Sequence, residues 1–203
     1  MSAIPSRDRR SERAEATRRE ILDAAWALVR EEGLASLTMR DLGARVGMKA
    51  QSLYGYFASK HDIYDAMFAT GAQQFVDAEP WDQLNGDAVH DVRCFVHSFV
   101  RFCAADLARY QLLFQRPIPG FEPSAASYAI AESTLARVGE QLAGLGITDP
   151  RALDLLTALS AGLASQQLAN DPGGDRWIRL IDDAVEMYVT YMTASNSTGT
   201  SAR

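Results

Sequence analysis

Apolar residues recur along most of the chain at spacings of three and four, which is the period of an amphipathic α-helix. Between Asp87 and Ala105, for example, Val89, Val92 and Val96 fall on one helical face. Runs that alternate apolar with polar residues, as half-buried strands do, are almost missing. The pattern therefore predicts an all-α protein with about nine helices.

Local signals predict where these helices begin and end. A Thr or Ser followed three residues later by Asp or Glu forms a capping box, which satisfies free N–H groups at the start of a helix. Such boxes occur at Thr17, Thr38 and Ser59, while Gly33 and Gly47 predict helix ends. The expected helices span residues 17–33, 38–46, 50–57, 59–78, 87–105, 106–114, 124–145, 149–170 and 175–194.

The second and third of these helices are short and are joined by a turn that contains Gly47. This arrangement is typical of a helix-turn-helix, whose second helix can lie in the major groove of DNA. With Leu53 facing inward, Gln51 and Ser52 point outward and suit hydrogen bonding to bases or phosphates. Periodicity alone fits a helical hairpin inside an enzyme or scaffold equally well.

Charge is distributed unevenly along the chain of 203 residues, whose formal net charge is −6. Residues 1–60 hold 11 Lys or Arg against 8 Asp or Glu, whereas residues 61–203 hold 9 against 18. A basic N-terminal part favours a nucleic-acid partner there, although an Arg-rich solubilising tail explains the same residues. The arginines that crowd the first twenty positions are Arg7, Arg9, Arg10, Arg13, Arg18 and Arg19.

Residues 38–48, with the sequence TMRDLGARVGM, together with residues 52–57 and Lys60, resemble the DNA-binding domain of the TetR family of bacterial transcriptional regulators. The resemblance covers about residues 17–64. It implies a homodimeric repressor or activator that binds palindromic DNA and releases it when a small molecule enters the C-terminal domain. Lys49 stands where many members have a capping Ser or Thr. The residues expected to contact DNA are Thr38, Arg40, Lys49, Gln51, Ser52, Tyr54, Tyr56 and Lys60.

These observations divide the chain into four expected parts: a flexible basic arm at 1–13, a helix-turn-helix domain at 14–60, a helical ligand-binding and dimerisation domain at 61–195, and a disordered tail at 196–203. Cys94 and Cys103 lie too far apart on one expected helix to form a disulfide. Because the sequence also has no apolar leader or membrane-spanning run, we expect a cytoplasmic protein.

Aromatic residues in the C-terminal part predict where a small, largely apolar effector binds. They cluster before and after the break near Asp106, and a Pro-rich loop follows them. The alternative is a solid aromatic core, since aromatic residues at helical spacing mostly serve packing. The candidate ligand-binding residues are Phe95, Phe99, Phe102, Tyr110, Phe114 and Tyr128, with the amides of Gln166 and Gln167.

The last two long helices predict a homodimer interface. One carries a stripe of small residues that permits close approach, and the other carries larger apolar residues at alternating spacings of four and three. The alternative is that both stripes close the core of a single chain. The candidate interface residues are Ala158, Ala161, Gly162, Ser165, Trp177, Ile181, Ala184, Tyr188 and Tyr191.

His90, Cys94 and His97 invite a metal-site interpretation, but seven residues of helix separate the outer two by about 10.5 Å. We expect no metal and no cofactor. The sequence has no nucleotide loop, catalytic serine motif or paired carboxylates, so we expect no enzyme. A small helical enzyme or binding protein with an aromatic cavity remains the alternative, and a ligand-free assembly factor is a third class.

Overall fold

The computed structural model describes residues 6–199, with side chains from residue 9 to residue 194. Within this range the chain forms nine α-helices and three short 3-10 helices, and no strand. The prediction of an all-α fold is therefore confirmed. The helices are α1 (Ser6–Glu32), α2 (Met39–Arg45), α3 (Ala50–Leu53), α4 (Lys60–Ala78), α5 (Ala88–Ala105), α6 (Leu107–Phe114), α7 (Ala125–Gly144), α8 (Ala152–Asn170) and α9 (Ile181–Gly199).

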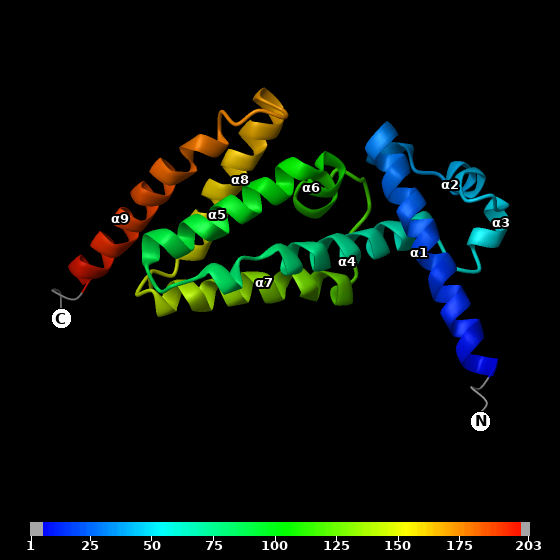
Figure 1. Cartoon of the computed structure of the whole chain (residues 1–203), viewed down its shortest axis with the longest axis horizontal. Coiled ribbons are helices and arrows are strands. Elements are labelled where there is room, and N and C mark those ends of the chain that lie inside the picture. The colour runs from blue at the N-terminus through cyan, green and yellow to red at the C-terminus, as the bar shows by residue number, and fades with distance from the viewer. Residues whose placement is uncertain (1–5, 200–203) are drawn as a thin grey trace.

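Helices α1, α2 and α3 form one end of the molecule, and α4 extends from them alongside α7 into a bundle with α5, α6, α8 and α9 (Figure 1). Asp65 on α4 fixes the start of α7. Its Oδ1 accepts the backbone N–H of Ser124 at 2.7 Å, and its Oδ2 accepts the hydroxyls of Ser124 and Ser127 at 2.9 and 3.0 Å. The α4–α7 pair is thus joined by hydrogen bonds as well as by apolar contact.

Two apolar cores stabilise the fold. The N-terminal core is built on α1, α2 and α3, but it also includes Ile63, Tyr64 and Met67 of α4 and Ala108 and Leu112 of α6. The second core gathers α5, α7, α8 and α9. Because α4 and α6 contribute to the N-terminal core, the helix-turn-helix is anchored on two helices of the larger bundle.

Most helix starts follow the predicted caps. Asp87 begins α5 by accepting the N–H of His90 at 2.8 Å, and Ser124 begins α7 by accepting the N–H of Ser127 at 3.2 Å. These caps are local interactions between residues three positions apart, which is why the sequence reveals them.

The first helix starts earlier than the sequence predicts. Residues 6–13, expected in a flexible arm, belong to α1, while residues 1–5 lie outside the described residues. The hydroxyl of Thr17 donates to the carbonyl of Arg13 at 3.0 Å, so this residue lies inside the helix instead of capping it. The box at Thr17 was therefore misread as a helix start.

Three further helices have bounds that differ from the expected ones. α3 ends at Leu53 instead of continuing to Phe57, and α8 begins at Ala152. α9 begins at Ile181, after a 3-10 turn over Ile178–Leu180, and reaches Gly199. The expected disordered tail therefore overlaps a helix up to residue 199, and residues 200–203 lie outside the described residues. Among the described residues, no helix has the length and hydropathy needed to cross a membrane.

Candidate functional site

The first helix of the helix-turn-helix begins at the predicted cap. The Thr38 hydroxyl oxygen accepts the N–H of Asp41 at 3.1 Å, and the same hydroxyl donates to the Asp41 carboxylate at 2.6 Å. The pair starts α2 and holds Thr38 in extended backbone geometry. The hydroxyl proton of Thr38 is therefore already used, and a phosphate contact requires it to leave Asp41.

Two glycines allow α2 and α3 to approach each other. Gly47 has φ of +68°, a left-handed conformation that L side chains rarely adopt, and it turns the chain between the helices. At Gly43 a Cβ atom would lie 2.7 Å from the carbonyl oxygen of Met48 and 3.2 Å from the nitrogen of Ala50. The carbonyl of Gly43 also accepts the N–H of Met48 at 2.8 Å. Gly43 therefore sets how closely α3 packs on α2.

Helix α3 presents a polar face to solvent. Leu53 and Phe57 are buried at 0% and 2% exposure, whereas Gln51 and Ser52 are exposed and Tyr54 is 50% exposed. After Leu53 the chain tightens into i to i+3 hydrogen bonds around Gly55, which explains the early end of the helix. The predicted outward face is confirmed, although the helix that carries it is shorter.

A contact from α1 holds the segment that follows α3. The Arg18 guanidinium donates to the carbonyl of Tyr56 and lies 4.0 Å from the ring centroid of Phe57. Arg18 was grouped with the arginines that crowd the first twenty positions, but it holds the segment that follows α3 in place. Its position one turn before Leu22, at the edge of the apolar face of α1, was the available signal.

The remaining predicted DNA contacts surround α3 at different depths. Arg40 and Lys49 are exposed, and Lys49 begins α3 without a side-chain cap, as predicted. Tyr56 is half-buried. Lys60 begins α4 beside the Ser59 cap and has its Nζ atom 5.7 Å from the Tyr64 ring centroid. Among residues 9–194, Arg40, Lys49 and the partly covered Lys60 of this surface form no ion pair.

Arg45, which also lies on α2, is paired and contributes less positive charge. Its guanidinium forms a double hydrogen bond with the carboxylate of Glu31 on α1. This bond lowers the pKa of Glu31 below its usual range and keeps the carboxylate charged. Both groups are at the surface, so the pair orients α2 on α1 more than it adds stability.

The predicted aromatic ligand residues form three separate groups. Phe99, Phe102 and Phe114 surround Phe75 of α4, with ring centroids 5.0–5.9 Å from it, and Tyr110 lies 6.1 Å from Phe114. Phe95 packs on Trp81 at 5.2 Å, and Tyr128 stacks on Phe68 at 6.5 Å. Phe75 was missed, because it lies on α4 and only the tertiary fold brings it to the other rings.

The amide of Gln167 is buried and fully used within the chain. Its nitrogen donates to the carbonyl of Asp171, and its oxygen accepts the N–H of Trp177 at 2.9 Å. Gln166 is exposed and accepts a hydrogen bond from Asn170 at 2.6 Å. The Gln167 amide fastens the turn between α8 and α9, which accounts for its burial without a ligand.

The predicted interface residues divide into an exposed and a buried set. Ala158, Ala161, Gly162 and Tyr191 are exposed, and Ser165, Trp177 and Ala184 are half-buried. Ile181 and Tyr188 are 0% and 7% exposed, and the Tyr188 hydroxyl donates to the carbonyl of Ala152 at 2.8 Å. These two belong to the core of the chain, so their assignment to an interface is corrected. Exposed apolar side chains that were missed include Leu155, Leu180 and Met187.

The histidines and the half-buried Cys94 of α5 contact other side chains of the protein. The Cys94 sulfur lies 3.6 Å from Nε2 of His90, and Nε2 of His97 lies 3.2 Å from the Asp182 carboxylate on α9. Among the described residues, no group of three or more His, Cys, Asp and Glu side chains is arranged to hold a metal ion.

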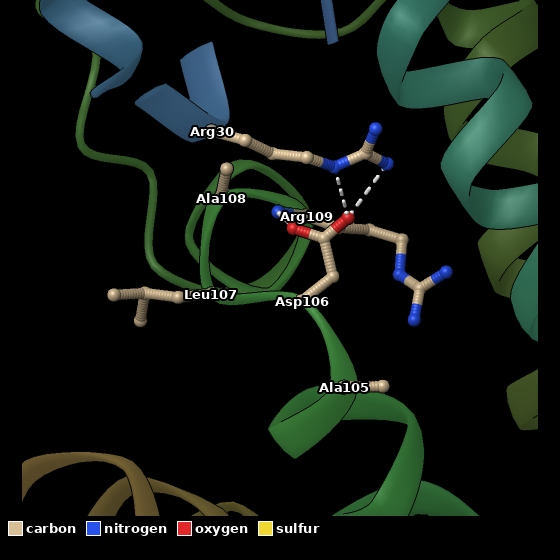
Figure 2. Close-up of a pocket in the computed structure, with 6 residues that line it drawn as sticks. All are labelled: Arg30, Ala105, Asp106, Leu107, Ala108 and Arg109. Atoms are coloured by element: carbon tan, nitrogen blue, oxygen red, sulfur yellow. Dashed lines mark hydrogen bonds and ion pairs between the residues drawn. The ribbon is translucent and has the colours of Figure 1, made fainter. Parts of the chain in front are cut away.

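The helix-turn-helix end and the bundle also meet through an ion pair. Arg30 on α1 reaches the carboxylate of Asp106, between α5 and α6, with an Nη2–Oδ2 distance of 2.8 Å (Figure 2). A hollow of about 460 Å³ lies beside this contact and is lined by Arg30 and by residues 105–109. The ion pair is a direct connection from α1 to the α5–α6 junction.

Comparison with known proteins decides the family. Residues 21–67, which include α2, the turn and α3, match the family model described as "Bacterial regulatory proteins, tetR family". Residues 21–67 are thus a TetR-family domain. The match covers the residues on which the resemblance to this family was based, from the Thr38 cap to Lys60.

A curated relative is similar over most of the chain. The HTH-type transcriptional repressor Rv1353c of Mycobacterium tuberculosis (strain ATCC 25618 / H37Rv) is 26% identical over 160 residues, which cover 79% of this chain and 59% of the relative. The chain thus spans about 59% of the length of that relative. The similarity includes the bundle helices as well as the helix-turn-helix.

Solved structures share the fold. The putative regulatory protein SCO4313 superposes with a TM-score of 0.74 at 20% identity, over 89% of this chain and 98% of the other. The Streptomyces coelicolor TetR-family protein ActR, solved in complex with actinorhodin, gives a TM-score of 0.62 at 17% identity, over 88% of this chain and 97% of ActR. At these identities the likeness concerns the fold alone.

Proposed function

We propose that this protein is a ligand-responsive transcriptional repressor that binds a palindromic operator as a homodimer. The observation that carries the proposal is the solvent-facing side of α3, where Gln51, Ser52 and Tyr54 are exposed next to the free cations of α2 and α3. A short polar helix held rigidly on two supporting helices has the shape that enters a DNA major groove.

In this proposal the exposed side chains have different roles. Gln51 reads a base edge, because its amide can donate to and accept from adenine. Arg40, Lys49 and Lys60, with the hydroxyls of Thr38, Ser52, Tyr54 and Tyr56, contact phosphates and fix the register.

The proposed dimer forms through α8 and α9. The small exposed residues Ala158, Ala161 and Gly162 permit close approach of a second α8. On α9, Met187 and Tyr191 are 74% and 54% exposed and offer apolar surface to the partner. Two copies related by a two-fold axis then present two α3 helices to half-sites spaced about 34–36 Å apart or a multiple of it.

The proposed effector is small and largely apolar, and it binds in the bundle next to the aromatic group around Phe75. The ActR complex with actinorhodin supports a ligand in a protein of this fold. α4 carries Phe75 and also begins at Lys60, so a ligand that shifts α4 changes the spacing of the two α3 helices and lowers DNA affinity.

Footprinting with the DNA upstream of the protein's own gene tests the proposal. We expect a protected palindrome and an affinity that falls steeply with salt, because phosphate contacts release counterions. The Gln51→Ala variant should protect this palindrome less strongly than the parent protein does. Non-specific DNA binding, with no protected site in any genomic fragment, would contradict the proposed function.

A further inference from the structure

A groove of about 550 Å³ runs along α5, between the end of α4 and the start of α6. The residues that line it include three arginines (Arg93, Arg101 and Arg109), two histidines (His90 and His97) and no Asp or Glu. This is unusual for residues 61–203, where acidic residues outnumber basic ones by 18 to 9. The groove therefore concentrates positive charge on the acidic part of the chain.

One end of the groove is already neutralised from α9. The Asp182 carboxylate lies 3.1 Å from Nε of Arg93 and 3.2 Å from Nε2 of His97. Glu186 adds a longer contact of 4.0 Å to Arg93. This end has little charge left for a ligand.

The other end holds Arg101 and Arg109, whose guanidinium groups form no ion pair among residues 9–194, although the Asp106 carboxylate accepts the backbone N–H of Arg109. Arg109 donates only to neutral acceptors, the side-chain oxygen of Gln74 at 3.0 Å and the carbonyl of Phe102 at 2.9 Å. Its Nε atom is buried and makes no hydrogen bond within the described part of the chain. Arg101, four residues before Ala105 on α5, is exposed and has neither a hydrogen bond nor an ion pair among residues 9–194.

Apolar surface lies next to these cations. The Arg109 guanidinium lies 3.7 Å from the ring centroid of Phe102, which packs on Phe75 at 5.0 Å. Ala78, Pro80 and Ala105 also belong to the apolar part of the lining. An anion with an apolar portion matches this arrangement better than a free inorganic ion, because charge and apolar area are adjacent.

We propose that this groove is a binding site for the oxyanion of a small amphipathic molecule. Its carboxylate or phosphate oxygens accept hydrogen bonds from Arg101 and Arg109, and its apolar part lies against Phe102 and Pro80. The site shares Phe102 with the aromatic group proposed for the effector, and it adds Arg101 and Arg109, which do not belong to that group.

Calorimetric titration of the full chain tests this site with three probes of equal chain length: octanoate, octyl phosphate and octanol. We expect octanoate, octyl phosphate or both to bind saturably with one molecule per chain, and octanol to bind much more weakly. The better of the two anions identifies the oxyanion as a carboxylate or a phosphate. Absence of binding by both anions, or equally tight binding of octanol, overturns the proposal.

Arg101 is the residue to replace, because it is exposed and its side chain has no hydrogen-bond or ion-pair partner among residues 9–194. Arg101→Ala should lower the affinity for the anion at least about tenfold. Arg101→Glu should lower it more, and Arg101→Lys less. The exposed Arg179→Ala, which removes one positive charge outside the groove, should leave the affinity within about twofold. Equal weakening by Arg101→Ala and Arg179→Ala means that net charge alone attracts the anion, and this overturns the site. An operator-binding measurement on Arg101→Ala separates this test from that of the proposed function.

Discussion

Arg30 and Asp106 connect the helix-turn-helix end of the molecule to the bundle, and the same carboxylate begins α6. Oδ2 of Asp106 accepts the Nε–H of Arg30 at 2.9 Å, while Oδ1 accepts the backbone N–H of Arg109 at 3.1 Å (Figure 2). The Asp106 side chain is only 10% exposed, whereas that of Arg30 is 50% exposed. Asp106 therefore has two structural roles and Arg30 has one.

We predict that Asp106→Ala lowers the free energy of unfolding by about 1–3 kcal/mol, because it removes a helix cap and leaves Arg30 unpaired. Arg30→Ala should cost less than about 1 kcal/mol, since half of its side chain is already in water. Urea denaturation measures both. Asp106→Asn keeps an acceptor for the cap and should fall between the two; a loss in Arg30→Ala as large as in Asp106→Ala contradicts this division of roles.

A second prediction concerns Gly43, where a Cβ atom would meet the Met48 carbonyl oxygen at 2.7 Å. That oxygen belongs to the backbone, so Gly43→Ala must displace the start of α3. We expect this variant to bind operator DNA at least about tenfold more weakly and to lose about 1–3 kcal/mol of stability. Fluorescence anisotropy with labelled operator and urea denaturation provide the two values.

Gly144→Ala is the matched control for Gly43→Ala. It also places a methyl group on a helical glycine, but no other atom lies within 4 Å of the new Cβ. Its operator affinity should equal that of the parent protein, and its stability should be unchanged or higher by about 0.5–1 kcal/mol. Normal DNA binding by Gly43→Ala would show that the α2–α3 contact tolerates a shift.

The third prediction separates phosphate contacts from base contacts. Lys60→Ala should weaken binding to all sequences alike, whereas Gln51→Ala should change base preference at one position of each half-site by about 1–3 kcal/mol. Selection of binding sites from a random library, carried out on both variants, measures this. The roles are exchanged if Lys60→Ala alters the preferred sequence and Gln51→Ala does not.

The sequence predicts those features that depend on residues close together in the chain. The caps at Thr38, Ser59 and Asp87 each need only a neighbour three residues away, and the inward position of Leu53 follows from helical periodicity. Thr17 shows the limit of such signals. The same Thr–Glu spacing begins a helix or lies within one, depending on whether the preceding residues are already helical.

Features that depend on tertiary contacts were not accessible in this way. The partners of the Gln167 oxygen lie ten and eleven residues further along, across a turn whose shape the sequence does not give. On α9 one apolar stripe faces the core and other apolar residues face solvent, so Ile181, expected at the interface, lies in the core, and the exposed Met187 was missed. Phe75 joins the aromatic group only because α4 packs beside α5 and α6.

The fourth prediction follows from Glu79, at the end of α4. Burial raises the pKa of its carboxyl from 4.5 to about 7, although the charge of Arg137 opposes the shift. Its Oε2 atom is buried without a hydrogen bond in the described part of the chain. The folded state therefore favours the neutral carboxyl, and between pH 4.5 and about 7 the unfolded chain binds fewer protons. The contribution of Glu79 to stability must fall as the pH rises through this range.

Glu79→Gln replaces the carboxyl with a neutral amide of the same shape. The variant should gain stability relative to the parent as the pH rises from about 5 to about 8, measured by urea denaturation at each pH. Glu140→Gln, an exposed position on α7, is the control and should show no such gain. A difference between Glu79→Gln and the parent that stays constant with pH contradicts the raised pKa.

The last prediction tests the α8–α9 dimer. Gly162 is exposed, and a Cβ atom there has no other atom within 4 Å, so a side chain can begin at this position without a clash at its first atom. In the proposed dimer, however, a large ring on the small-residue stripe of α8 keeps the second α8 away. We therefore expect light scattering to give the mass of a dimer for the parent protein and that of a folded monomer for Gly162→Trp.

Met187→Glu, which places a charge on the exposed apolar face of α9, should also give a monomer, because burying an unpaired carboxylate is costly. Both monomeric variants should also lose most of their operator affinity, since each α3 then binds its half-site alone. If Gly162→Trp and Met187→Glu both remain dimeric, the interface lies on another face of the bundle.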